Sequence, residues 1–182
     1  MLLVVNAAQV RGILFGESGL AAHLKPGTVV MVSSTIASAD AQAIAEALAE
    51  YQLLMLDAPV SGGAVKAAAG DMTVMASGSD AAFARLAPVL DAVAGKVYRI
   101  GSDIGLGSTV KIIHQLLAGV HIAVAAEAMA LAARAGIPLE TMYDVVTHAA
   151  GTRMRIACST SRMAITRQNP LSIFLSKIRA GE

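Results

Sequence analysis

Lys111 is the residue whose type and surroundings best suit it to proton transfer. It lies in the stretch GLGSTVKIIHQ, close to the start of a long apolar segment with helical spacing. An amine buried among apolar side chains loses hydration, which lowers its pKa towards neutrality unless a carboxylate lies beside it. Such an amine can take a proton from a hydroxyl group or return one to an alkoxide. A lysine that reaches solvent from a helix N-terminus is the other interpretation of the pattern.

Two further groups could bind a ligand beside this amine. Gln115 follows Lys111 by four residues, so both side chains share one helix face and can contact the same ligand. In the segment DAPVSGG, Ser61, Gly62 and Gly63 offer a hydroxyl and unhindered amides at the start of a short helical stretch. A carboxylate would be stabilised at such a helix end. A tight turn that needs glycine dihedrals would have the same sequence.

Polar residues also follow two other apolar runs. Asn6 comes after MLLVV, and the run Ser33, Ser34 and Thr35 comes after TVVMV. Each could contact a cofactor at the edge of a sheet, and each could equally cap the helix that follows.

The elements that must position these residues alternate between strand and helix up to about residue 101. Apolar runs at 1–5, 28–34, 52–57, 72–77 and 96–100 predict strands. The segments 6–16, 39–51 and 79–93 have helical periodicity, with Ser38 as a cap for the second and a cap at Ser79 for the third. This order predicts an α/β fold with a doubly wound sheet, whose ligands bind outside the carboxyl ends of the strands. No G-x-G-x-x-G motif occurs in the chain.

The pattern changes at GSDIGLG, which we interpret as a hinge. Residues 106–135 contain no proline and are rich in Ala, Leu, Ile and Met, which predicts a helix of about 45 Å that crosses a whole domain. We therefore predict a partial nucleotide-binding domain over residues 1–103 and the start of an all-helical domain over 104–151. A membrane span is disfavoured by His114, Gln115, His121 and Glu127 within the apolar run.

The composition excludes several classes of protein. The chain has 182 residues, of which 55% are hydrophobic and 3% aromatic, with a formal net charge of +1. It therefore has ample material for a core and no basic stripe for nucleic acid. The single cysteine, Cys158, excludes a disulfide framework and fits a reducing cytoplasm. The histidines lack metal-ligand spacing with carboxylates, so we predict no metal site.

Taken together, DAPVSGG, the strand end SST at 33–35 and GLGSTVKIIHQ resemble the β-hydroxyacid dehydrogenase family. That family includes 3-hydroxyisobutyrate, 6-phosphogluconate and tartronate semialdehyde enzymes, and within it the sequence is most similar to the L-threonate dehydrogenase branch. The resemblance covers residues 1–151. It implies the C-terminal half of a Rossmann-like domain, followed by a helical domain for substrate binding and dimerisation.

The resemblance implies a role for each candidate residue. Ser61, Gly62 and Gly63 would hold the substrate carboxylate, and Lys111 would be the acid/base on the hydroxyl group under oxidation. Gln115 would position the substrate. Residues that line the nicotinamide and its ribose would be Asn6 and Thr35.

The implied activity is hydride transfer from a small hydroxy acid, similar to L-threonate or 3-hydroxyisobutyrate, to NAD or NADP. The implied protein is a cytoplasmic homo-oligomer without nucleic-acid or membrane partners. The alternative is an inactive fragment whose long helix acts as a dimerising module.

Both ends of the chain depart from the resemblance. The start corresponds to the middle of the family's cofactor domain, so we expect an N-terminal truncation and weak binding of NAD(H) by the polypeptide as written. After Gly151 the apolar periodicity is lost and Arg, Ser and Thr become frequent. Plausible codons for this tail, read one base earlier, spell a continuation of the family pattern. We therefore expect residues 152–182 to be a frameshifted translation and this fragment to be inactive.

Overall fold

The computed structural model describes residues 1–149 of the chain, so the predicted frameshifted tail lies outside the described residues. Two compact units make up the chain, the first Met1–Ile113 and the second beginning at His114. The division falls inside one long helix. The predicted domain boundary after residue 103 stays a prediction.

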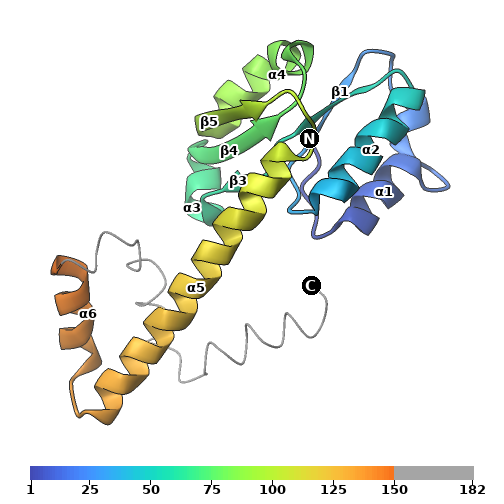
Figure 1. The fold of residues 1–182 in the computed structure, drawn as a ribbon. Helices are drawn as coiled ribbons and strands as arrows, with labels where there is room; N and C mark the ends of the chain where they lie inside the picture. The colour runs from blue at the N-terminus through green and yellow to red at the C-terminus, as the bar shows by residue number, and fades with distance from the viewer. Residues whose placement is uncertain (150–182) are drawn as a thin grey trace. The chain divides into compact units, whose positions relative to one another are not determined.

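The first unit is built on a mixed sheet (Figure 1). Strands β1 and β2 are parallel, β4 and β5 are parallel, and β4 runs antiparallel to both β2 and β3. The elements of this unit, in chain order, are α1 (Ala7–Phe15), the 3-10 helix η1 (Leu20–His23), β1 (Val29–Val32), α2 (Ser38–Glu50), β2 (Leu54–Asp57), β3 (Val60–Ser61), α3 (Gly63–Ala68), β4 (Met72–Ser77), α4 (Asp80–Val93), β5 (Ala94–Gly101) and the start of α5 (Leu106–Arg134).

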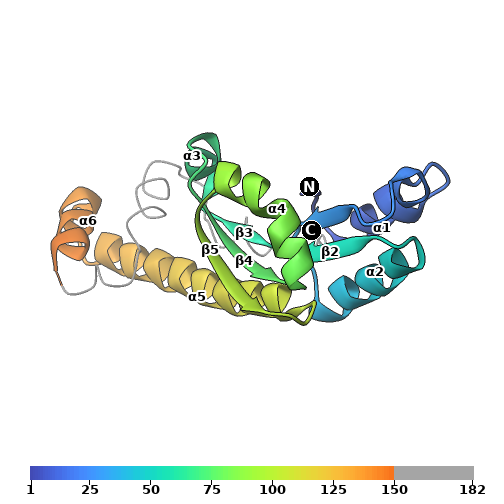
Figure 2. The ribbon, with the colours of Figure 1, turned by 90° about the horizontal axis from the view of Figure 1, so that it is seen from above.

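Helices cover the two faces of this sheet, as the alternation of elements predicts. Side chains at alternate positions of a strand point to opposite faces. Accordingly Val30 and Val32 belong to a core with α1 and α2, while Met31 belongs to a second core with Leu56 and Phe83 of α4. Figure 2 shows α4 over the strands β4 and β5. The predicted Rossmann-like α/β class is confirmed, with helices on both faces.

Two local details differ from the sequence reading. The stretch MLLVV forms only an isolated parallel bridge, between Leu2 and Val32, instead of a full strand. Ser38, expected as a cap, is the first residue of α2, and Ala37 precedes it without a side-chain hydrogen bond to the helix. By contrast Ser79 caps α4 as predicted, because its side chain accepts a hydrogen bond from the backbone N–H of Ala82.

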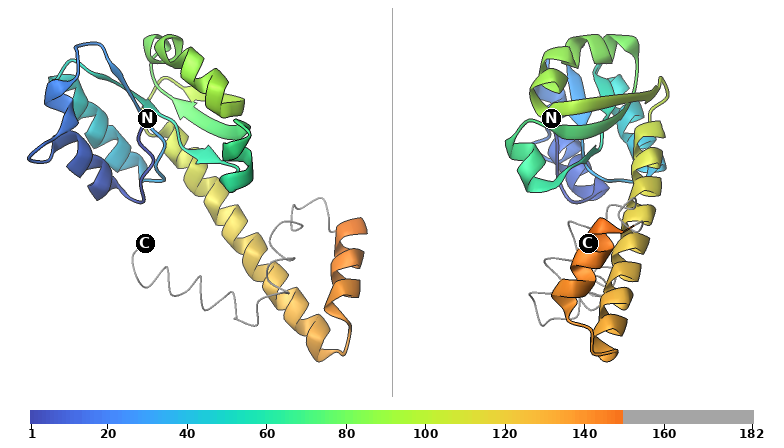
Figure 3. Two further views of the ribbon diagram at one scale, coloured as in Figure 1. Left: turned by 180° about the vertical axis from the view of Figure 1, so that it is seen from behind. Right: turned by 90° about the vertical axis from the view of Figure 1, so that its left-hand side faces the viewer.

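The second unit contains most of α5 together with α6 (Leu139–His148). A turn at Gly136, which has a positive φ of 76°, joins the two helices (Figure 3). Helix α5 has 29 residues. Among the described residues it is the one helix long and apolar enough to cross a membrane, judged by length and composition only. The core helix of a soluble protein passes the same test.

Candidate functional site

The parallel strands β1 and β2 end at the same edge of the sheet. Val32 pairs with Asp57, so the run that begins at Ser33 and the segment that begins at Ala58 leave the sheet side by side. Strand β4 meets this edge through one pair, Asp57 with Ser77. This edge is where the doubly wound topology predicts a ligand.

The turn after β2 has the geometry that its sequence predicts. Ser61 ends β3 and is half-buried, whereas Gly62 and Gly63 are exposed and have φ values of 149° and 71°. A Cβ atom on Gly62 would lie 2.8 Å from the Cβ of Lys66, so only glycine fits there. The turn therefore presents a hydroxyl and accessible backbone amides at the start of α3.

Lys111 is buried, with 6% of its surface exposed, although its apolar neighbours Ile112 and Ile113 are 45% and 55% exposed. Burial lowers the pKa of its amine below the ordinary lysine value. It belongs to the first unit, in the second turn of α5. Gln115 lies one turn further, on the second unit, and is exposed.

A buried carboxylate, that of Asp57, ends β2 and is hydrogen-bonded to the first turn of the helix that carries Lys111. Asp57 is fully buried, and its Oδ2 atom accepts hydrogen bonds from the backbone N–H groups of Gly105 (3.0 Å) and Ser108 (2.8 Å). Its Oδ1 atom accepts one from the Ser108 hydroxyl at 2.7 Å. The Ser77 hydroxyl lies 3.4 Å from Oδ2 and accepts a hydrogen bond from the Gly107 N–H at 3.0 Å. Burial raises the pKa of Asp57, and the hydrogen bonds from Ser108, Gly105 and Ser77 oppose this shift.

Chain connectivity limits how far the candidate residues can lie from this carboxylate. Since consecutive Cα atoms are about 3.8 Å apart, the four residues from Asp57 to Ser61 span at most about 15 Å. Lys111 follows Ser108 by three residues, about 4.5 Å along the helix axis. The glycine turn and the lysine, whose pKa is lowered by burial, are thus both connected through short stretches of chain to one edge of the sheet.

The two predicted cofactor residues are placed differently. Asn6 caps α1, because its side-chain oxygen accepts a hydrogen bond from the Gln9 N–H at 2.9 Å. Thr35 is exposed just beyond β1. A third polar residue, Ser33, directly follows β1. It is 1% exposed, and its hydroxyl has no hydrogen-bond partner among the described residues. The Ser33 hydroxyl is thus a buried polar group left unsatisfied by the described residues.

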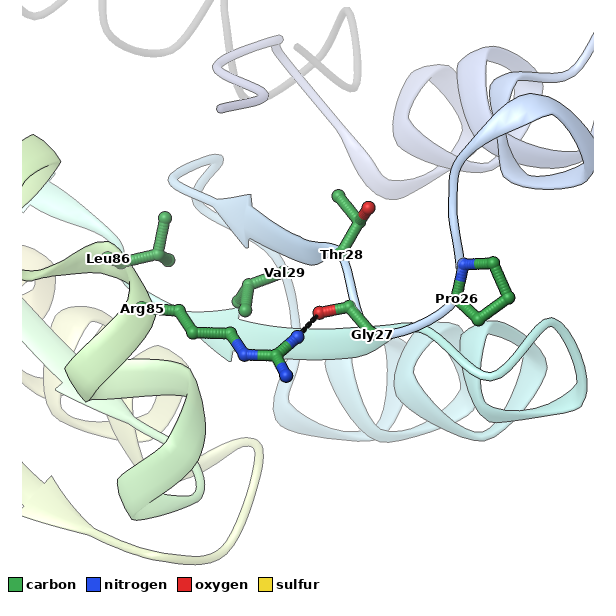
Figure 4. A pocket seen from close by; sticks show the side chains of 6 residues that line it. All are labelled: Pro26, Gly27, Thr28, Val29, Arg85 and Leu86. Atoms are coloured by element: carbon green, nitrogen blue, oxygen red, sulfur yellow. Dashed lines mark hydrogen bonds between the residues drawn. The ribbon is translucent and has the colours of Figure 1, made fainter.

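A pocket of about 390 Å³ lies elsewhere in the first unit. It is at the amino end of β1, where the Arg85 guanidinium donates a hydrogen bond to the Gly27 carbonyl (Figure 4). Its lining residues are Pro26, Gly27, Thr28, Val29, Arg85 and Leu86. Because ligands of this topology bind at the carboxyl edge, the pocket is separate from the candidate site. Within residues 1–149, no cluster of three His, Cys, Asp or Glu side chains could hold a metal ion.

Sequence reasoning missed Asp57, Ser77 and Ser108. The available signal was an aspartate placed directly after an apolar strand, because a carboxylate in that position is buried and needs hydrogen-bond donors. The donors themselves were not visible, since they lie 48 and 51 residues further along the chain.

The fold and this edge define a class of protein. A sheet with helices on both faces and polar residues at the carboxyl ends of its strands is typical of α/β proteins that bind ligands at that edge.

The comparisons with known proteins establish the family. Residues 1–101 match the family described as the NAD-binding domain of 6-phosphogluconate dehydrogenase. Residues 105–172 match the NAD-binding domain of NADP-dependent 3-hydroxyisobutyrate dehydrogenase. The chain therefore belongs to this family of NAD- or NADP-binding dehydrogenase domains, which confirms the resemblance drawn from its motifs.

Individual relatives agree with this assignment. L-threonate dehydrogenase of Escherichia coli is 82% identical over 151 residues, which are 83% of this chain and 50% of that protein. The same enzyme of Pectobacterium atrosepticum is 80% identical, with the same coverage of 83% and 50%. A crystal structure of 3-hydroxyisobutyrate dehydrogenase from Salmonella typhimurium is 77% identical, with a TM-score of 0.78, over 82% of this chain and 52% of that one. The chain spans about half the length of the curated relatives it matches.

Proposed function

We propose that the protein is an oxidoreductase that transfers hydride from a small hydroxy acid to NAD or NADP. The substrate class is that of L-threonate or 3-hydroxyisobutyrate, which are the names of the similar enzymes. The observation that carries the proposal is the burial of Lys111, with its lowered pKa, in a helix that begins at the carboxyl edge of the sheet.

Each residue of the site then has a chemical task. The backbone amides of Gly62 and Gly63 and the Ser61 hydroxyl bind the substrate carboxylate, which leaves the carbinol carbon oriented toward the cofactor. Lys111, whose pKa is lowered by burial, takes the hydroxyl proton in its unprotonated form as the carbonyl forms. Gln115 positions the substrate beside it. When bound, the nicotinamide accepts the hydride.

Thr35 and Ser33 are the residues that we assign to the nicotinamide riboside. Both follow β1 at the carboxyl edge, and the Ser33 hydroxyl is buried without a partner in the described part of the chain. Asn6 would contribute only if its side chain left the cap of α1, which costs about 1 kcal/mol. We therefore keep Asn6 as the weaker of the predicted cofactor contacts.

The direct test is an activity assay of a chain of the relatives' full length that carries residues 1–151 of this sequence. Purified protein is incubated with L-threonate or 3-hydroxyisobutyrate and with NAD or NADP, and reduced cofactor is followed by its absorbance. We expect turnover with one of these acids and one of these cofactors. Absence of turnover with every pair would contradict the proposed activity.

A second candidate function is a dimerising module without catalysis. Apolar side chains of α5 favour it, because Ile113 is 55% exposed, Leu116 67% and Leu131 67%. This alternative expects a stable dimer in sedimentation experiments and no thermal shift with cofactor.

A cytoplasmic location and the absence of membrane partners belong to the first proposal, and partition of the protein into detergent would contradict them.

A further inference from the structure

We propose that Asp57 is a positioning residue: its carboxylate holds the first turn of α5 on the sheet edge and thereby sets the place of the Lys111 amine. The inference rests on the proposed acid/base role of Lys111. It adds to that role a residue that contacts neither substrate nor cofactor.

The start of α5 carries backbone N–H groups that need hydrogen-bond partners from outside the helix. The first N–H groups of a helix have no partner within it, and a buried helix end needs partners from elsewhere. Here Leu106 donates to the Asp103 carbonyl at 3.4 Å, Gly107 to the Ser77 hydroxyl and Ser108 to Asp57. Thr109 already donates to the Gly105 carbonyl. Every early N–H of this helix is therefore bonded, two of them to side chains of the sheet.

The helix cannot supply such a cap from its own preceding residue. That residue is Gly105, which has no side chain, has a φ of 98°, and would place a Cβ atom 2.3 Å from the Ser38 hydroxyl. A Cβ on Gly107 would lie 2.6 Å from the Met75 carbonyl oxygen and 2.7 Å from that of Asp57. The two glycines of GLGS let the helix end rest directly on the strands β2 and β4, and the sheet supplies the cap.

Asp57 is suited to this task by its charge and its place. An ionised carboxylate accepts hydrogen bonds only, and all four groups around it are N–H or O–H donors. A negative charge at a helix N-terminus is also favourable. Because Lys111 lies three residues after Ser108, one helical turn transmits the position of this cap to the amine.

The test uses hydrogen exchange and lysine acylation, neither of which needs turnover. Asp57→Asn keeps the shape of the side chain but replaces one acceptor oxygen by a donor group. Ser108→Ala keeps the Asp57 charge and removes only the 2.7 Å hydrogen bond. Asp91→Asn, an exposed carboxylate on α4, is the matched control.

In Asp57→Asn we expect the amides of residues 105–109 to exchange at least tenfold faster, with those of α4 unchanged. We expect Lys111 to be acylated severalfold faster, since its amine gains access to water. The exposed Lys96 gives the reference rate in the same sample. Ser108→Ala should show the same changes to a smaller extent, and Asp91→Asn should show none.

Two outcomes would overturn the proposal. One is unchanged exchange and acylation in Asp57→Asn. The other is faster exchange in α4 and α5 alike in both variants, which would show general stabilisation without positioning. Should Asp57→Asn fail to fold, Ser108→Ala is judged by the same criteria. The acid/base role of Lys111 is tested by a different measurement, the turnover of the Lys111→Ala variant. A failure of that role is therefore recognised separately from a failure of this proposal.

Discussion

At the scale of single residues, the chemistry depends on a lysine that has lost most of its contact with water. Burial lowers the pKa of Lys111, whereas it raises the pKa of Asp57, because desolvation disfavours the charged form of either group. The two residues nevertheless differ in their surroundings. Four hydrogen-bond donors surround the carboxylate, which suits it to cap a helix, whereas the role that we propose for the amine is that of a base.

Replacement of Lys111 by alanine should lower kcat/KM for oxidation of the hydroxy acid by about 10²- to 10⁴-fold, since a general base of this kind contributes about that much. The change should lie mainly in kcat, as the substrate carboxylate is held elsewhere. Steady-state kinetics of the complete protein measure it. The exposed Lys96, replaced by alanine, is the control. Retained turnover in Lys111→Ala would remove the acid/base assignment.

The lowered pKa of Lys111 also predicts how stability depends on pH. Between the lowered folded pKa and the ordinary value of 10.5, the unfolded chain binds a proton that the folded chain does not. The free energy of unfolding due to this group therefore rises with pH across that window and is lost as pH falls through the folded pKa. Urea titrations at a series of pH values, compared between the wild type and Lys111→Met, isolate the contribution. A difference between the two proteins that does not change with pH would contradict it.

At the scale of elements, the main feature is the contact of the first turn of α5 with the ends of β2 and β4. The helix carries the lysine, and its first turn is bonded to side chains of both strands. The stretch GLGSTVK thus serves two purposes in the fold. Its glycines allow close approach to the sheet, and its lysine follows at the distance of one turn.

Gly105→Ala should destabilise the protein by about 1–3 kcal/mol, because φ is 98° and the new methyl group would meet the Ser38 hydroxyl. Gly12→Ala is the matched control. It lies inside α1 with open space around a Cβ atom, so the same substitution should stabilise by about 0.5–1 kcal/mol. Urea unfolding of both variants gives the two values. Equal effects of the same sign would show that backbone strain at residue 105 has been misjudged.

At the scale of the whole molecule, the chain combines a sheet-based unit with a helical one. The polar carboxyl edge lies entirely in the first unit, whereas Gln115 and the exposed apolar side chains Leu116 and Leu131 belong to the second. The candidate residues of the carboxyl edge and the exposed apolar surface of α5 thus belong to different units.

The 182-residue polypeptide by itself should bind NAD(H) weakly. It contains no G-x-G-x-x-G motif, whose backbone amides and helix N-terminus hold the pyrophosphate in this class of fold. Calorimetric titration measures this directly, with a chain of the relatives' full length that carries residues 1–151 as the positive control. Micromolar affinity of the polypeptide would contradict the expectation.

Local patterns determined much of this protein. The strand at 72–77 and the cap at Ser79 follow from residues within a few positions of one another, where periodicity and capping act. The glycine turn was likewise predictable, since Gly62 adopts a backbone conformation that other residues resist.

Only the tertiary structure decided the rest. In the structure β4 runs antiparallel to β2, and MLLVV forms only an isolated bridge. Asn6 caps α1, and Asp57 is bonded to a helix that begins 49 residues later. The physical reason is range. Backbone propensity acts over one or two turns of chain, whereas a buried carboxylate takes its donors from whatever the fold brings within 3 Å, and no short stretch of sequence records that.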